Sequence, residues 1–142
     1  MSPKVFITGI TGMVGSHLLD FLLENTEWEI HGLIRWRSPI DNISHHVKKI
    51  NSKNRIYLHY GDITDYLSLV PIFKSRNFDY VFHLAAQSYP KTSFDSPSCT
   101  YETNVLGTEN VLKCCKEYCP NSTIHNCSSS EVFGRVPKHL VP

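Results

Sequence analysis

The sequence has no long apolar run, no block of like charge and no C-x-x-C pair. No stretch approaches the roughly 20 apolar residues that span a bilayer, and the N-terminal M-S-P-K lacks the apolar core of a secretory leader. Fourteen Lys and Arg stand against thirteen Asp and Glu, a formal net charge of +1. The five cysteines are odd in number, which disfavours a disulfide framework or a structural zinc. We therefore expect a soluble cytoplasmic protein with no nucleic-acid or membrane partner.

The eight histidines show no metal-site pattern. His45 and His46 form the densest pair, but adjacent residues on a helix point in different directions and no third ligand follows at metal-site spacing. We expect no metal, and histidines that lie on the surface or are partly buried. Cys115 and Cys119 fall on an apolar stripe and are expected to be small core residues.

The 142 residues, 41% of them apolar, suffice for one compact α/β domain. Short runs rich in β-branched and aromatic residues predict strands at 4–8, 29–35, 55–60, 80–85 and 122–128, with helices between them. This alternation predicts a doubly wound parallel sheet of the Rossmann type, with strand order 3-2-1-4-5.

Two helices carry apolar stripes. The first helix has one side formed by Val14, Leu18, Phe21, Leu22 and Asn25. In the fourth helix a stripe predicted to face the sheet consists of Tyr101, Val105, Thr108, Leu112, Cys115 and Cys119.

Three of the seven glycines lie between the first predicted strand and the first helix, in T-G-x-x-G-x-x-G from Thr8 to Gly15. One glycine permits a tight turn, another lets backbone approach a diphosphate, and the last lets the helix pack close to the strand. The free N–H groups of the helix then attract the anion. A turn that only connects strand to helix would have the same glycines. We predict a diphosphate site formed by Gly9, Thr11, Gly12, Met13, Val14 and Gly15.

The residues after the second and third strands predict how the adenosine end is recognised. Arg35 and Arg37 flank Trp36, and no carboxylate follows until Asp41, which favours NADP over NAD. Solvated loop arginines would give the same pattern. Asp62 follows the third strand, where it could accept a hydrogen bond from adenine or serve only as a turn residue.

Further motifs follow the glycine turn along the chain: G-D at 61–62, H-L-A-A-Q-S at 83–88, N-V-L-G-T at 104–108 and S-S-S-E-V-F-G at 128–134. Together they resemble the motifs of the extended short-chain dehydrogenase/reductases that act on nucleotide sugars. Within that superfamily, I-T-G-I-T-G-M-V-G-S-H-L-L-D-F-L-L, H-G-L-I-R-W-R-S, A-A-Q-S-Y-P-K-T-S-F and S-S-S-E-V-F-G are most similar to the GDP-mannose 4,6-dehydratase family.

The resemblance implies roles for residues at the ends of the third and fourth strands. Ile63 would contribute to the cofactor site beside Asp62. Leu84, Ala85, Ala86 and Ser88 would line the nicotinamide side, with Ser88 also near the substrate. Asn104 and Gly107 would serve packing and helix geometry.

The segment after the fifth strand indicates the reaction type through the same resemblance. The reaction takes a hydride from hexose C4, removes the C5 proton, expels water from C6 and returns the hydride to C6. Glu131 would be the base, Ser129 would hold the sugar, and Ser130 would contact the substrate where dTDP-glucose dehydratases have an aspartate. On position alone, Glu131 could be a cap partner or a solvated loop charge.

The Y-x-x-x-K pair of the superfamily does not occur after the fifth strand, since no tyrosine follows Tyr118 and the only later lysine is Lys138. The last predicted strand would also leave a sheet edge uncovered. We therefore expect residues 1–142 to be the N-terminal, NADP-binding portion of a longer enzyme and to be inactive alone. A nucleotide-sugar epimerase or reductase remains an alternative, as does a non-catalytic NADP-sensing module if the protein ends at Pro142. The resemblance also implies a homo-oligomer, either a dimer or a tetramer.

Overall fold

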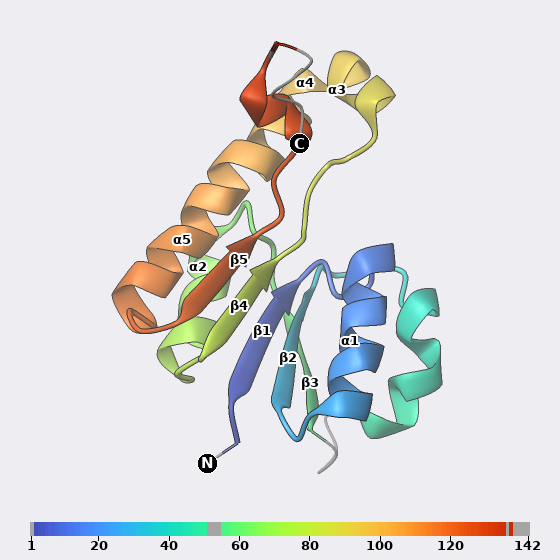
Figure 1. Ribbon diagram of the computed structural model, residues 1–142, viewed down its shortest axis with the longest axis vertical. Helices are drawn as coiled ribbons and strands as arrows, with labels where there is room; N and C mark the ends of the chain where they lie inside the picture. The colour runs from blue at the N-terminus through green and yellow to red at the C-terminus, as the bar shows by residue number, and fades with distance from the viewer. Residues whose placement is uncertain (1, 51–54, 136, 138–142) are drawn as a thin grey trace.

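The computed structural model describes residues 2–50, 55–135 and 137 (Figure 1). The strands are β1 (Lys4–Thr8), β2 (Glu29–Ile34), β3 (Ile56–Tyr60), β4 (Tyr80–His83) and β5 (Thr123–Asn126). The α-helices are α1 (Met13–Asn25), α2 (Tyr66–Lys74), α3 (Pro90–Asp95), α4 (Pro97–Tyr101) and α5 (Gly107–Tyr118). Two 3₁₀ helices, η1 (Asp41–Lys49) and η3 (Ser130–Phe133), and a π-helical turn, η2 (Glu102–Leu106), complete the described elements.

The five strands form one parallel sheet in the order β3-β2-β1-β4-β5, as the sequence predicts. β4 and β5 end two residues earlier than predicted. Just after β4, the N–H groups of Leu84 and Ala85 both donate to the Thr8 hydroxyl, and the N–H of Leu84 also donates to the Thr8 carbonyl. Thr8 therefore holds the start of the loop that follows β4.

Helices cover both faces of the sheet (Figure 1). The side chains of β1 alternate between two cores: Phe6 packs on the face that carries α2 and α5, whereas Val5 and Ile7 pack on the face that carries α1. Ile43 of η1 is fully buried in the second core. This arrangement is the doubly wound architecture that the alternating pattern predicts.

The two predicted helix stripes are partly wrong. In α1, Leu19 and Leu22 are buried, but Val14 and Phe21 are 54% and 59% exposed. The reason is Gly15, which lies against the glycine turn and thereby sets which face of the helix points inward.

In the fourth predicted helix, Cys115 and Cys119 are buried as expected, whereas Tyr101, Val105 and Leu112 are exposed. The π-helical turn inserts extra backbone between α4 and α5, so a stripe counted at regular helical steps loses its phase. The residues that α5 presents to the sheet are Gly107, Val111, Cys114 and Cys115.

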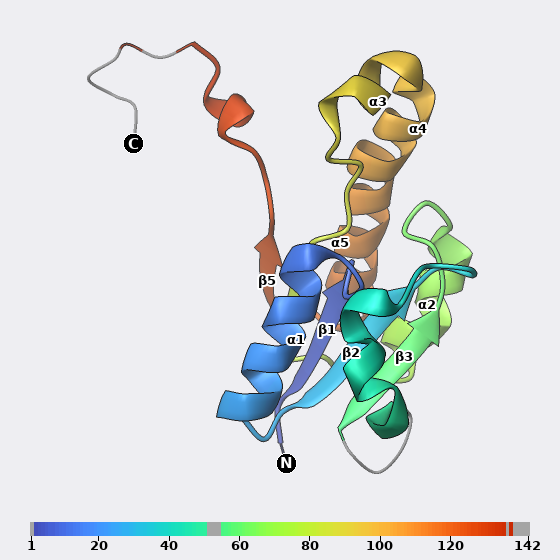
Figure 2. The ribbon, with the colours of Figure 1, turned by 90° about the vertical axis from the view of Figure 1, so that its right-hand side faces the viewer.

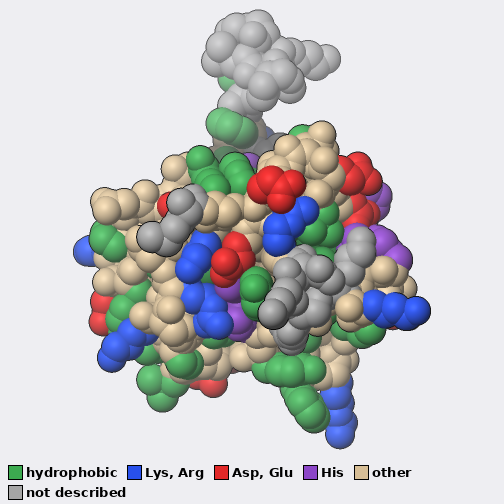
Figure 3. Space-filling view, turned by 90° about the horizontal axis from the view of Figure 1, so that it is seen from below, with side chains coloured by type: hydrophobic (Ala, Val, Ile, Leu, Met, Phe, Trp, Pro, Cys, Tyr) green, Lys and Arg blue, Asp and Glu red, His purple; other side chains and the backbone are tan. Residues whose placement is uncertain are grey.

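All five strands have their carboxyl ends on the same side of the sheet. The helices α3 and α4 and the segment after β5 extend from this side (Figures 1 and 2). On the side of the molecule where the strands begin, the Lys/Arg and Asp/Glu side chains are interspersed rather than gathered in one patch (Figure 3). Within the described residues, no helix combines the length and apolar character needed to cross a membrane.

Candidate functional site

The turn between β1 and α1 is built from main-chain contacts. Gly9 has φ +72°, a conformation that side-chain-bearing residues rarely adopt, and the N–H of Gly12 donates to its carbonyl at 2.9 Å. A Cβ on Gly9 would lie 2.9 Å from the Ala85 nitrogen. The turn therefore lies directly against the segment that follows β4.

Gly15 brings α1 close to the same turn. A Cβ at this position would lie 2.2 Å from the Gly9 carbonyl oxygen and 2.7 Å from the Ile10 Cα, distances that no side chain tolerates. The last glycine thus has the packing role that the motif predicts, and it fixes the start of α1 above the end of β1.

The N-terminus of α1 is open. Gly12 is the N-cap residue, no side-chain cap bonds to this terminus, and its first turn carries no acidic residue. Gly12, Met13 and Val14 are exposed. A Cβ on Gly12 would meet one atom within 4 Å, the Gly9 carbonyl oxygen at 3.2 Å. Uncapped N–H groups at the positive end of a helix, with free space before them, suit a phosphate group.

Thr8 joins this turn to the end of β4, a role that the sequence analysis did not assign. Its buried hydroxyl accepts from the N–H groups of Leu84 and Ala85, both at 3.1 Å, and lies 2.8 Å from Nδ1 of His83. Burial lowers the pKa of His83, which favours a neutral ring. Nδ1 can then accept from Thr8 while Nε2–H donates to Thr108 Oγ1 at 3.0 Å.

Asn104 holds the next part of the same segment. Its Oδ1 accepts from the backbone N–H of Gln87 at 2.8 Å, and its Nδ2 donates to the Gln87 carbonyl at 2.9 Å. Asn104 lies in the π-helical turn, and such turns occur frequently at functional sites. Gly107, one turn later, leaves room for Ile63, since a Cβ there would lie 2.7 Å from the Ile63 side chain.

A hollow of about 430 Å³ lies between the ends of β4 and β5. It brings together Ala85, Ala86 and Ser88 from one segment and Ser129 from the other, all of them predicted site residues. Its remaining lining residues are His83, Gln87, Asn104, Thr108, Asn126, Cys127 and Ser128. The predicted nicotinamide and sugar positions therefore share one hollow.

Ser129 and Glu131 lie at the start of η3. Ser129 is the N-cap, and its hydroxyl accepts from the backbone N–H of Glu131 at 3.2 Å. The Glu131 side chain is exposed and does not belong to the described lining of the hollow. The side chain of Ser130 lies outside what the structure describes.

A second hollow, of about 550 Å³, lies beyond the ends of β2 and β3. Arg35, Arg37 and Asp62 line it together, with the rings of Trp36 and Tyr60 5.4 Å apart. Its other lining residues are Ser38, Pro39, Gly61, Asp65 and Ser68. Two guanidinium groups, aromatic rings and two carboxylates are groups that can contact the adenosine end of a dinucleotide.

Asp62 also has the turn role that the sequence left open. Its Oδ1 accepts from the backbone N–H and the hydroxyl of Thr64, both at 2.9 Å. Ile63 is 5% exposed and packs in the core, so any contact of this residue with a ligand would come from its backbone. Leu84 is likewise partly buried against the core around α1.

The sheet order, the open helix terminus and the hollows along one edge define a protein with the Rossmann dinucleotide-binding fold. The model of the GDP-mannose 4,6 dehydratase family matches residues 6–141. The chain belongs to this family.

Relatives with that name occur in a fungus and an animal. The chain is 40% identical over 136 residues to GDP-mannose 4,6-dehydratase sdnI of Sordaria araneosa and 40% identical over 138 residues to GDP-mannose 4,6 dehydratase of Drosophila melanogaster. These matches cover 93% and 92% of this chain but 24% and 34% of the relatives, so the chain spans about a quarter of the first relative and about a third of the second.

The solved structures include the UDP-Glc/GlcNAc 4-epimerase of Campylobacter jejuni. It matches with a TM-score of 0.81 and 23% identity, over 94% of this chain and 39% of that one. At this identity the likeness shows the fold alone.

Proposed function

We propose that this chain is the NADP-binding portion of a nucleotide-sugar 4,6-dehydratase that acts on GDP-mannose or a related GDP-sugar. The observation that carries the proposal is the uncapped N-terminus of α1, which lies at the same sheet edge as the two hollows. Both curated relatives described above are named as enzymes of this reaction.

The residues present fit NADP. The space before Gly12 suits the diphosphate, and the hollow with Arg35 and Arg37 suits the adenosine and its 2′-phosphate. Ala85 and Ala86 have small side chains at the other hollow, where a flat nicotinamide ring needs room. The end of β1 lies between this hollow and the one that Arg35 lines, so an extended dinucleotide would pass over the glycine turn.

In the proposed reaction, bound NADP supplies a reversible hydride acceptor. With NADP bound, the C4 hydride would be held by the cofactor and given back at C6. The C4 hydroxyl proton and the C6 hydroxyl would leave as water, and the proton taken from C5 would be returned to C5. We assign Glu131 as the base that removes the C5 proton and Ser129 and Ser88 as hydroxyl groups that hold the sugar. The position of Ser129 and Ser88 on one hollow supports the assignment of the two hydroxyl groups. The role of Glu131 rests on its place two residues after Ser129. Ser130 follows directly after Ser129 and is proposed to contact the substrate.

We also propose that the enzyme works in the cytoplasm as a homo-oligomer. The exposed apolar side chains of Tyr101, Val105 and Leu112, all on one helical segment, support an assembly of this kind.

A chimera tests the proposed reaction. In it, this chain replaces the matching third of the Drosophila relative, and the product formed from GDP-mannose is identified by NMR. We expect a 4-keto-6-deoxy sugar with no net change in NADPH absorbance. Glu131→Gln should bind NADP and GDP-mannose but dehydrate at least about 100-fold more slowly, because the base is lost.

The matched control is Glu24→Gln, which removes an exposed carboxylate from α1 and should leave the rate unchanged. An epimerised sugar as the product would contradict the dehydratase proposal. Undiminished dehydration by Glu131→Gln would remove Glu131 from its assigned role.

A further inference from the structure

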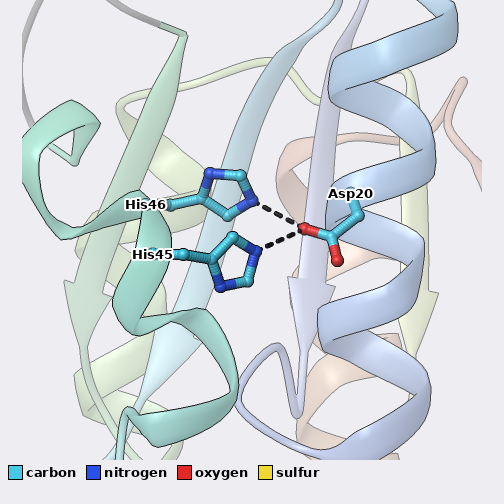
Figure 4. Close-up of side chains that lie close together, drawn as sticks. All are labelled: Asp20, His45 and His46. Atoms are coloured by element: carbon cyan, nitrogen blue, oxygen red, sulfur yellow. Dashed lines mark hydrogen bonds and ion pairs between the residues drawn. The ribbon is translucent and has the colours of Figure 1, made fainter.

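Three potential metal ligands converge between α1 and η1, away from the hollows. Nε2 of His45 and Nε2 of His46 lie 3.0 Å and 2.6 Å from the same Oδ1 of Asp20 (Figure 4). The ligand atoms of the three residues all lie within 4.8 Å of one another. The expectation that the adjacent histidines point apart is therefore wrong.

The reason for the error lies in the side chains and in the tertiary fold. Both imidazole rings turn toward α1, with their centroids 4.0 Å apart. The third group, Asp20, is 25 residues before His45, on a different element, so no spacing rule applied to the histidines alone could find it.

We propose that Asp20, His45 and His46 bind a divalent transition-metal ion, with Zn²⁺ as the best fit to two imidazole nitrogens and one carboxylate oxygen. Such a set is common at zinc sites that keep further positions for water. The exposure of the side chains fits this arrangement: His46 is 11% exposed and forms the inner wall, whereas Asp20 and His45 are 39% and 54% exposed and leave an approach from solvent.

The ligand atoms lie near the positions that a zinc ion requires, since all three are within 4.8 Å of one another. Zinc–ligand bonds of about 2.0–2.2 Å in a tetrahedron place neighbouring ligand atoms about 3.3–3.6 Å apart. The present separations of 3.0 Å and 2.6 Å are somewhat shorter, because hydrogen bonds rather than a metal join these atoms. Rotation of the exposed side chains of Asp20 and His45 can lengthen these separations to the values that zinc requires.

The charge state of Asp20 suits a metal. Although burial raises the pKa of this carboxyl, hydrogen bonds from His46 and His45 lower it, and the net pKa lies below the usual value. The carboxylate is therefore ionised at neutral pH. On metal binding, the proton on each Nε2 must move to Nδ1 of the same ring. Nδ1 of His46 is buried without a hydrogen-bond partner among the described groups, which limits the affinity.

A metal here would tie η1 to α1. The same η1 segment reaches the glycine turn through Asn42, whose Nδ2 donates to the Thr11 carbonyl at 2.8 Å. Asp20 nevertheless lies seven residues after Met13 along α1, or about 10 Å at 1.5 Å per residue. The metal site is therefore separate from the proposed diphosphate site and does not depend on it.

Calorimetric titration of the chain with zinc chloride tests the proposal. All samples carry Cys99→Ser and Cys127→Ser, because these exposed thiols could bind zinc themselves. We expect one equivalent of zinc to bind. Asp20→Asn and His45→Gln should each weaken binding at least about tenfold, since each removes one ligand. His17→Gln is the matched control, because His17 is an exposed histidine on the same helix and lies outside the cluster.

Circular dichroism spectra establish that each variant is folded, and the exposed position of His45 makes its variant the decisive one. A second readout is the thermal midpoint, which zinc should raise in the parent chain and not in His45→Gln. The absence of zinc binding by the folded parent would overturn the proposal. Equal affinity in the parent, Asp20→Asn and His45→Gln would overturn it as well.

Discussion

The turn between β1 and α1 and the segment after β5 differ in how they are held. Around the turn, the backbone of Gly9 and Ile10 leaves no space for a Cβ on Gly15, and Thr8 bonds the turn to the next segment. After β5, Ser129 caps a short turn through one hydrogen bond, and Glu131 is exposed. The geometry proposed for the diphosphate is thus set by packed main chain, whereas the proposed base is an exposed side chain on the short 3₁₀ helix η3.

The largest expected effect comes from Gly15→Ala, which breaks the packed region. A Cβ placed 2.2 Å from the Gly9 oxygen forces α1 away from the turn. We expect the free energy of unfolding to fall by more than about 3 kcal/mol, at the severe end for a single substitution. Urea denaturation followed by circular dichroism measures this. A loss of less than about 1 kcal/mol would contradict the close packing assigned to this helix.

The same substitution at Gly12 should separate binding from folding. Its Cβ would meet only the Gly9 oxygen, at 3.2 Å, and would otherwise fill the space proposed for the diphosphate. We expect Gly12→Ala to remain folded but to bind NADP at least about 100-fold more weakly, a loss of about 2.7 kcal/mol. Fluorescence titration provides the affinity. Unchanged NADP affinity in the folded variant would place the diphosphate elsewhere.

Arg35→Asp tests the adenosine end. Reversing this charge should weaken NADP at least about tenfold and leave NAD almost unaffected, because only NADP carries the 2′-phosphate. Lys91→Asp, an equal charge change on the exposed surface of α3, should leave both affinities unaltered. Competition titrations with the two nucleotides give the ratio. Equal losses of NADP and NAD in Arg35→Asp would refute the assignment.

The smallest effect is expected from Thr8→Val, which loosens the link between the turn and the end of β4. The N–H of Ala85 loses its acceptor, and a buried unsatisfied donor costs about 1–2 kcal/mol. Thr8→Ser keeps the hydroxyl and should recover most of the loss. Chemical denaturation of both variants provides the comparison. Equal stability of the valine and serine variants would show that the hydroxyl contributes nothing.

The sequence predicts the fold well because the relevant signals are local. Short runs rich in β-branched and aromatic residues identify each strand that the structure describes, and their alternation with helices favours the strand order that is observed. The helix stripes are less predictable. A π-helical turn shifts the phase before α5, and the contact of Gly15 decides which face of α1 is buried.

The candidate site likewise has a part that the sequence predicts and a part that it does not. The glycine turn can be predicted because strand, glycines and helix follow one another within 15 residues. The roles of Thr8, His83 and Asn104 depend on contacts between distant segments, such as the 17-residue separation between Asn104 and Gln87. A threonine before the first glycine and an asparagine that begins N-V-L-G-T were the available signals, but neither indicates its partner.

The binding of NADP by this chain can be measured by calorimetric titration of the folded, unmodified chain with NADP and with NAD. We expect one equivalent of NADP to bind, more tightly than NAD, since the open end of α1 and the arginine-lined hollow are both within this chain. Failure of a folded sample to take up either nucleotide would contradict the proposed dinucleotide site.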